Sequence, residues 1–93
     1  MFDFNLKRKP GPFQTGLFVV EPEAKDLQSR TGRRLRRLRR EDSLSVACVA
    51  ARIGVTQGFL AEVEAGRKSI SLRLLDEIAK VLDMNLSELL QDV

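Results

Sequence analysis

Hydrophobic positions between Leu44 and Gly66 predict two short helices joined by one tight turn. Ser45 is a residue type that often caps the start of a helix. The apolar residues after it fall on one helical face, namely Val46, Val49, Ala50 and Ile53. Gly54 tolerates a left-handed backbone, so the first helix is expected to end there after about two turns.

A second helix is expected over residues 56–65. Thr56 offers another N-cap, and Leu60 and Val63 stand at i and i+3 on the inward face. Gly66 supplies a stop, and Val55 in the turn is placed to drop its side chain between the two helices. Two short helices joined through a glycine turn have the plan of a helix-turn-helix.

A long helix is predicted before this pair. Pro22 suits its first turn, and an apolar stripe then recurs at helical spacing, at Leu27, Thr31, Leu35 and Leu38. Gly32 lies inside the stripe and predicts a break or a kink, because glycine weakens a helix interior.

Two helices are predicted after the pair. Ser71 caps the first of them, which has a buried stripe at Leu72, Leu75, Ile78, Ala79 and Leu82. Asn85 and Glu88 have the spacing of a capping box and start the last helix. Its apolar residues are Leu86, Leu89 and Leu90, which are expected to close the core.

The first 22 residues differ in pattern and predict a β-hairpin. Residues 2–6 alternate apolar and polar, residues 7–12 (KRKPGP) interrupt with two prolines and a glycine, and residues 13–20 favour a strand again. An isolated hairpin is marginal in water, so it should pack on the helices or on a second copy. Lys7, Arg8 and Lys9 are either a basic arm that touches phosphates or a solvated turn.

Length and composition limit the chain to one small domain and exclude most enzymes. We expect an extension over residues 1–22 and a helical domain over residues 23–93. Cys48 is the one cysteine and there is no histidine, so a disulfide, an ordinary zinc site and the commonest general base are all missing. We therefore expect no catalytic residue, no metal and no cofactor.

The same composition predicts a cytoplasmic protein. No apolar run approaches the length that spans a bilayer. Phe2 and Phe4 precede the basic residues at the N-terminus, which reverses the order found in a signal peptide. We expect no membrane partner.

Charge is distributed unevenly along the chain. The net charge is +3, but residues 1–52 carry 12 Lys and Arg against 6 acids, whereas residues 53–93 carry 4 against 7. Seven arginines fall within residues 30–40. Such a run is either a solvated helix face or a surface for nucleic acid or an acidic partner, because cations that neutralise phosphates release counterions.

The residues of the helix-turn-helix carry a family resemblance. The pattern comprises Leu44-Ser45, Val49-Ala50, Gly54-Val55-Thr56-Gln57, Phe59-Leu60, Glu64 and Gly66, and it extends back to Gly32 and forward to Leu90. In combination it resembles the phage-repressor-like (Cro and cI, XRE-type) DNA-binding domains. The resemblance implies a mainly α, five-helix lambda-repressor-like domain, here with the β-hairpin added, whose helix over residues 56–65 lies in the major groove of double-stranded DNA.

The same resemblance assigns residues to the DNA. Gln57 would contact a base, since glutamine can bond adenine in the major groove, with close approach at Gly58 and a methyl contact from Ala61. Phosphate contacts are expected from Ser45, Thr56, Arg67 and Lys68, with solvation of a plain loop as the alternative for the last two. The family commonly pairs an arginine at the place of Arg39 with a glutamate at the place of Glu64, as a structural ion pair.

The chain also departs from the family pattern. Ser43 stands where relatives often have glycine, so Asp42 or Ser43 must take a strained cap position. Val46, Ala47 and Cys48 replace a glutamine and glutamates, which removes one phosphate contact and adds apolar surface. We expect a dimer or partner surface formed by Phe4, Phe13, Leu17, Phe18 and Val46.

The expected function is that of a sequence-specific transcriptional regulator, a repressor acting as a homodimer. The alternative is an antitoxin-type interaction module that binds a protein such as a toxin and also its own operator. RNA binding through the arginine run is less supported, because the chain has no tyrosine or tryptophan for stacking. Operator, regulated genes and the role of the arginine run are not determined by these patterns.

Overall fold

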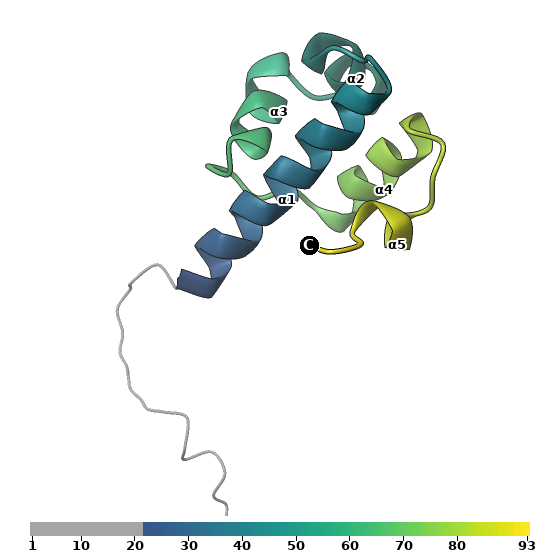
Figure 1. Ribbon diagram of the computed structural model, residues 1–93. Helices are drawn as coiled ribbons and strands as arrows, with labels where there is room; N and C mark the ends of the chain where they lie inside the picture. The colour runs from purple at the N-terminus through teal and green to yellow at the C-terminus, as the bar shows by residue number, and fades with distance from the viewer. Residues whose placement is uncertain (1–21) are drawn as a thin grey trace, which may run out of the picture.

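A long helix, α1 (Pro22–Glu41), crosses the molecule, and the remaining helices lie around its C-terminal part (Figure 1). The computed structural model describes residues 22–93. Within these residues the order continues with α2 (Val46–Ile53), α3 (Gln57–Glu64), α4 (Leu72–Val81) and α5 (Leu86–Leu89). The prediction of five helices is confirmed for this part of the chain. The predicted β-hairpin over residues 1–22 lies outside it, apart from Pro22, where α1 begins.

Side-chain caps begin the four shorter helices at the predicted residues. The hydroxyls of Ser45, Thr56 and Ser71 accept hydrogen bonds from backbone N–H groups three residues on, at 3.0, 3.0 and 3.1 Å. Asn85 and Glu88 form the full capping box, since each side chain accepts from the other residue's backbone N–H, at 2.8 and 2.9 Å. Each cap satisfies an N–H that the helix leaves without a partner, which is why these boundaries were predictable.

The core lies between α1 and the other helices. Its buried apolar residues come from all five: Leu35, Leu38, Val49, Ala50, Ile53, Leu60, Val63, Leu75, Ile78, Ala79, Leu82 and Leu89. Leu89 and Ala79 are fully buried, so even the single turn of α5 contributes a core residue. Leu86 and Leu90 pack partly buried at its edge.

Two leucines that the helical pattern placed in the core are exposed. Leu27 in α1 and Leu72 in α4 are 49% and 67% exposed. Both stand on the correct face of their helix but near its start, beyond the reach of the neighbouring helices. They line an apolar groove of about 350 Å³, together with Ile70, Leu90 and Val93. Helical periodicity identifies a face, whereas the covering element decides burial.

Gly32 does not break α1, so that prediction was wrong. The helix runs without interruption from Pro22 to Glu41. A Cβ at Gly32 would lie 2.4 Å from the carbonyl oxygen of Val63 and 2.6 Å from that of Glu64. Glycine is required here because the end of α3 approaches the backbone of α1 too closely for any side chain.

Turns between the helices use left-handed residues. Ser43, rather than Asp42, takes the strained position after α1, with φ 57°, and Gly54 and Gly66 follow α2 and α3 with φ 79° and 81°.

Among residues 22–93 no single helix has the length and apolar character to cross a membrane; α2 and α3 pass that test only as a pair, with a bend of 113° between them.

Gly32→Ala should destabilise the fold, because its methyl group meets two backbone oxygens that have no room to move. We expect a loss of about 1–3 kcal/mol in the free energy of unfolding, as for an overpacked core. Gly58→Ala is the matched control, since no atom lies within 4 Å of its Cβ position. It should be neutral or stabilising by up to about 1 kcal/mol, because alanine favours a helix. Urea unfolding measures both, and equal losses would contradict the close approach.

Candidate nucleic-acid interface

The turn between α2 and α3 sets the angle at which α3 leaves the body. The chain direction changes by 113° there, within the range of about 90–120° typical of a helix-turn-helix. Gly54 donates its N–H to carbonyls at the end of α2, and the Val55 N–H bonds the Ala50 carbonyl at 3.0 Å. The partly buried Val55 side chain packs against the core, as expected from its place in the turn.

One face of α3 is buried and the other is uncovered. Leu60, Val63 and Glu64 are 1%, 1% and 5% exposed. The outer residues Gln57, Gly58 and Ala61 are all exposed, so the structure brings the three expected base-contact positions onto one open face. Gly58 and Ala61 add almost no bulk, which leaves the amide of Gln57 as the one long polar group of the three.

Ser45 and Thr56 mark the starts of α2 and α3. Both are exposed, and both hydroxyls serve as N-caps. The free N–H groups and the positive end of the dipole make a helix start favourable for a phosphate. These two expected phosphate contacts therefore have a structural role as well as a suitable location.

Arg39 joins three segments through one guanidinium group. Its Nε and Nη2 donate to the two carboxylate oxygens of Glu64 at 2.7 and 2.9 Å, and its Nη1 donates to the Leu44 carbonyl at 2.7 Å. The side chains of Arg39 and Glu64 are 11% and 3% exposed. The hydrogen bond to Glu64 raises the pKa of Arg39. Arg39 thus fixes the end of α3 to α1 and to the residue that precedes the cap of α2.

Arg67 and Lys68 follow α3 and are exposed, as a phosphate contact requires. Arg67 is not free, because its Nε and Nη2 donate to the carboxylate of Glu62 at 3.1 and 2.9 Å. This hydrogen bond lowers the pKa of Glu62 and raises that of Arg67. The pairing was missed in the sequence, since its spacing of five residues crosses the helix end, where the i, i+4 rule no longer applies.

The expected dimer or partner surface is only partly within the described residues. Phe4, Phe13, Leu17 and Phe18 lie outside them. Val46 is half-buried and packs against the core of its own domain, so the apolar surface expected on α2 is smaller than the sequence indicated. Ala47 is exposed and Cys48 is half-buried.

The α2–α3 geometry, with its uncovered outer face on α3, defines the class of protein as a helix-turn-helix. The chain belongs to the family described as "Helix-turn-helix domain", whose pattern matches residues 30–91. This confirms the family resemblance found in the sequence and supports a DNA-binding regulator.

Three relatives each match about seven tenths of the chain. Control protein C.MunI from Mycoplasma sp is 35% identical over 69 residues, which are 73% of this chain and 93% of that protein. The restriction-modification controller protein C.AhdI from Aeromonas hydrophila has a TM-score of 0.68 at 30% identity, over 72% of this chain and 97% of that one. The clp gene regulator ClgR from Corynebacterium glutamicum has a TM-score of 0.67 at 30% identity, over 69% and 68%.

Removal of either Arg39 or Glu64 should destabilise the domain, because the other charge loses two short hydrogen bonds where little water reaches it. A loss of about 3–5 kcal/mol is expected for Arg39→Ala or Glu64→Ala. Arg37→Ala, an exposed neighbour on the same helix, should cost little. A double-mutant cycle by chemical unfolding measures the coupling, and additive losses would refute the pair's role.

Proposed function

We propose that this protein is a sequence-specific transcriptional regulator that inserts α3 into the major groove of double-stranded DNA. The observation that carries the proposal is the outer face of α3, where Gln57, Gly58 and Ala61 are exposed. Small residues around one amide allow close approach to the base edges, and glutamine can bond adenine there. Ser45, Thr56, Arg67 and Lys68 would hold phosphates on either side.

Action as a repressor follows from the resemblance to phage repressors: a protein bound over its site excludes other proteins from the same DNA. We place this activity in the cytoplasm, with the DNA. The relatives' names, a control protein and a restriction-modification controller, favour gene control as the role. The helical domain over residues 23–93 would carry DNA binding, and the extension over residues 1–22 would add to it.

A homodimer is part of the proposal. One recognition helix makes few base contacts, whereas a two-fold pair reads two half-sites about 34–36 Å apart. The apolar groove around Leu72 and Leu90 offers a surface that a second copy would cover. The N-terminal extension, through Phe4, Phe13, Leu17 and Phe18, is the rival surface.

An antitoxin-type role is the alternative, in which the same groove takes a different protein. The observation in its favour is again the exposure of Leu72 in an apolar setting. Co-purification of one small protein in stoichiometric amount, lost in Leu72→Lys, would favour this alternative over the homodimer.

Gln57→Ala tests base recognition. After the preferred site has been selected from random duplex DNA, the variant should lose about 1–3 kcal/mol on that site and little on random duplex. Arg67→Ala with Lys68→Ala should instead weaken both kinds of DNA and reduce the salt dependence of binding. Fluorescence anisotropy titrations compare the variants. Equal losses of Gln57→Ala on both kinds of DNA would contradict base recognition.

Leu72→Lys tests the dimer. The full chain should sediment as a dimer at micromolar concentration, and this variant should sediment as a monomer because a charge in an apolar interface is costly. Ala51→Lys, on the exposed side of α2, is the control and should remain dimeric. If Phe13→Ser with Leu17→Ser gives the monomer while Leu72→Lys does not, the extension forms the interface. A monomeric wild type would refute the homodimer.

A further inference from the structure

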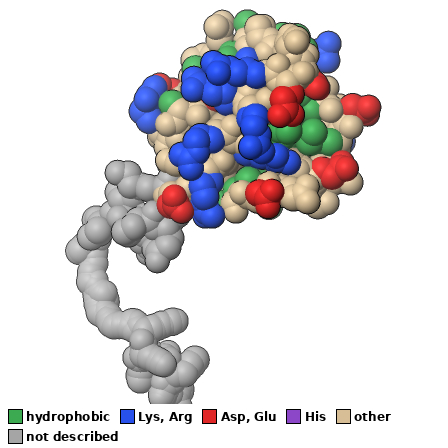
Figure 2. Space-filling view, viewed as in Figure 1, with side chains coloured by type: hydrophobic (Ala, Val, Ile, Leu, Met, Phe, Trp, Pro, Cys, Tyr) green, Lys and Arg blue, Asp and Glu red, His purple; other side chains and the backbone are tan. Residues whose placement is uncertain are grey.

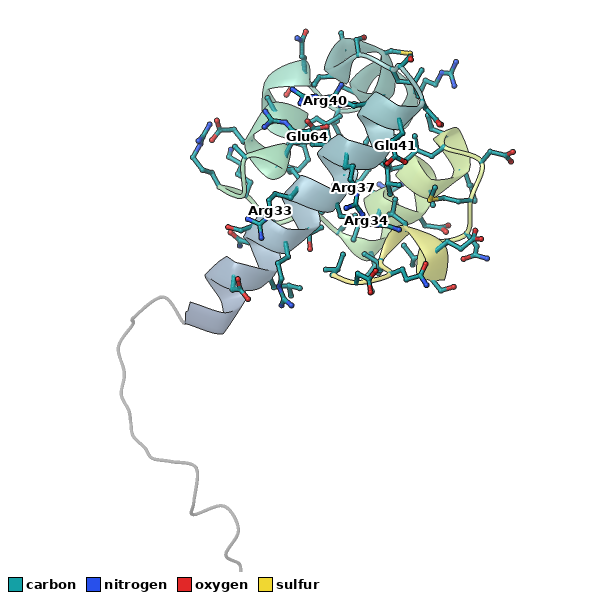
Figure 3. The ribbon with its side chains drawn as sticks, viewed as in Figure 1. Arg33, Arg34, Arg37, Arg40, Glu41 and Glu64 are labelled. Atoms are coloured by element: carbon teal, nitrogen blue, oxygen red, sulfur yellow. The ribbon has the colours of Figure 1, made fainter. Side chains whose placement is uncertain are left out.

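The outward face of α1 carries a row of arginines that the proposed major-groove contact does not use. Arg33, Arg36, Arg37 and Arg40 are exposed on successive turns. Figure 2 shows Lys and Arg side chains gathered on the face that α1 crosses, and Figure 3 shows Arg33, Arg37 and Arg40 in sequence along the helix. We refer to these four residues as the arginine face.

The other arginines of α1 have structural partners. Arg34 donates to the carbonyls of Leu89 and Glu88 at 2.9 and 2.8 Å, and so holds the end of α5. Arg30 lies 3.2 Å from Asp26 and donates to the Val93 carbonyl at 3.3 Å. Arg39 pairs with Glu64. Arg30, Arg34 and Arg39 therefore all make contacts within the domain.

Of the four residues of the arginine face, only Arg36 lies near a carboxylate of the described side chains. Arg36 Nε is 3.8 Å from a Glu64 oxygen, but Arg39 already occupies that carboxylate. Within the described side chains, Arg33, Arg37 and Arg40 have no carboxylate within 4.0 Å. Like charges three and four residues apart destabilise a helix slightly. Arg33, Arg37 and Arg40 therefore carry positive charge that no carboxylate of the described side chains pairs with.

The chemistry of the surface favours phosphate over protein. The arginine face lines a shallow groove of about 830 Å³ together with Arg30, Arg34, Glu41 and Asp92, so the lining comprises six arginines and two carboxylates. A protein partner needs an apolar interface core, which this groove does not offer. Phosphate binding needs no apolar core, because the planar guanidinium group of arginine binds a phosphate through two hydrogen bonds. Binding also releases counterions from the nucleic acid.

The arginine face lies next to the C-terminal end of α3. Arg36 lies beside Glu64, at the C-terminal end of α3, so the arginine face begins next to the helix proposed to enter the major groove. From Arg33 to Arg40 the helix rises by roughly 10 Å, about the length of three base pairs. Of the two cations that follow α3, Arg67 is paired with Glu62, which leaves Lys68 without an ion pair among the described side chains.

We propose that the arginine face is a second phosphate-binding surface, which holds the DNA backbone flanking the site that α3 reads. The inference rests on the proposed function and deepens it. The face contacts no base, so it contributes affinity and salt dependence without sequence preference. It also predicts a binding site longer than the base pairs that α3 covers.

The test compares the full-length wild type with Arg33→Gln/Arg37→Gln/Arg40→Gln. The control, Arg52→Gln/Arg73→Gln/Lys80→Gln, removes the same charge from α2 and α4. Binding is measured across salt concentrations on the selected site, with short and with extended flanks, and on random duplex. The slope of log affinity against log salt should fall by about 2–3 in the arginine-face variant, since each phosphate contact contributes about 0.9. In the control the slope should change by less than about 0.9, the contribution of one phosphate contact.

Further readouts separate this inference from the proposed function. The arginine-face variant should keep the wild-type ratio of affinities for selected and random DNA, lose the gain from longer flanks, and melt at or above the wild-type temperature. A slope equal to that of the wild type or of the control would overturn the inference while leaving the major-groove assignment intact. Tighter binding to single-stranded RNA than to duplex DNA, lost in the same variant, would overturn it in favour of RNA. A wild type without any sequence preference on duplex DNA would refute the proposed function instead.

Discussion

The ion pair between Arg39 and Glu64 is the interaction on which the rest of the arrangement depends. It joins residues 25 apart in sequence and connects α1, the turn before α2 and the end of α3. Two charges with so little exposure are stable only together, because neither has water to replace its partner. The pair therefore allows one position of α3 on α1, and the close backbone approach at Gly32 requires that same position. The outer face of α3 is presented at a fixed angle as a consequence.

The distribution of positive charge separates two tasks. On α3, the exposed residues Gln57, Gly58 and Ala61 supply one amide and little charge, and Glu62 neutralises the nearest arginine. On α1, the arginine face supplies charge and no base-specific geometry. In our proposals the short helix discriminates between sequences and the long helix holds the backbone. Such a division suits a small domain, because phosphate contacts provide much of the affinity while base contacts provide specificity.

Most of the fold could be predicted from the sequence because the signals that define helices are local. Caps at Ser45, Thr56, Ser71 and Asn85 satisfy N–H groups three residues away, and the apolar stripes repeat within one helix. Errors arose where a distant element decided the outcome. Leu72 has a core pattern but no covering helix, and Gly32 meets the backbone of α3 instead of breaking α1. The hairpin over residues 1–22 stays a prediction.

For the candidate site, the sequence by itself determined which residues stand at the helix starts and on the outer face of α3, because capping and periodicity follow from neighbours in the chain. The Arg39–Glu64 pair came from the family resemblance, since no local rule joins positions 25 apart. Tertiary structure alone decided that Gly32 is a point of close contact between α1 and α3. It also decided that Arg34 holds α5, whereas Arg33, Arg37 and Arg40 have no carboxylate nearby among the described side chains. The ion pair between Glu62 and Arg67 is a third such outcome. These outcomes depend on distances between separate helices or across a helix end, and packing sets those distances.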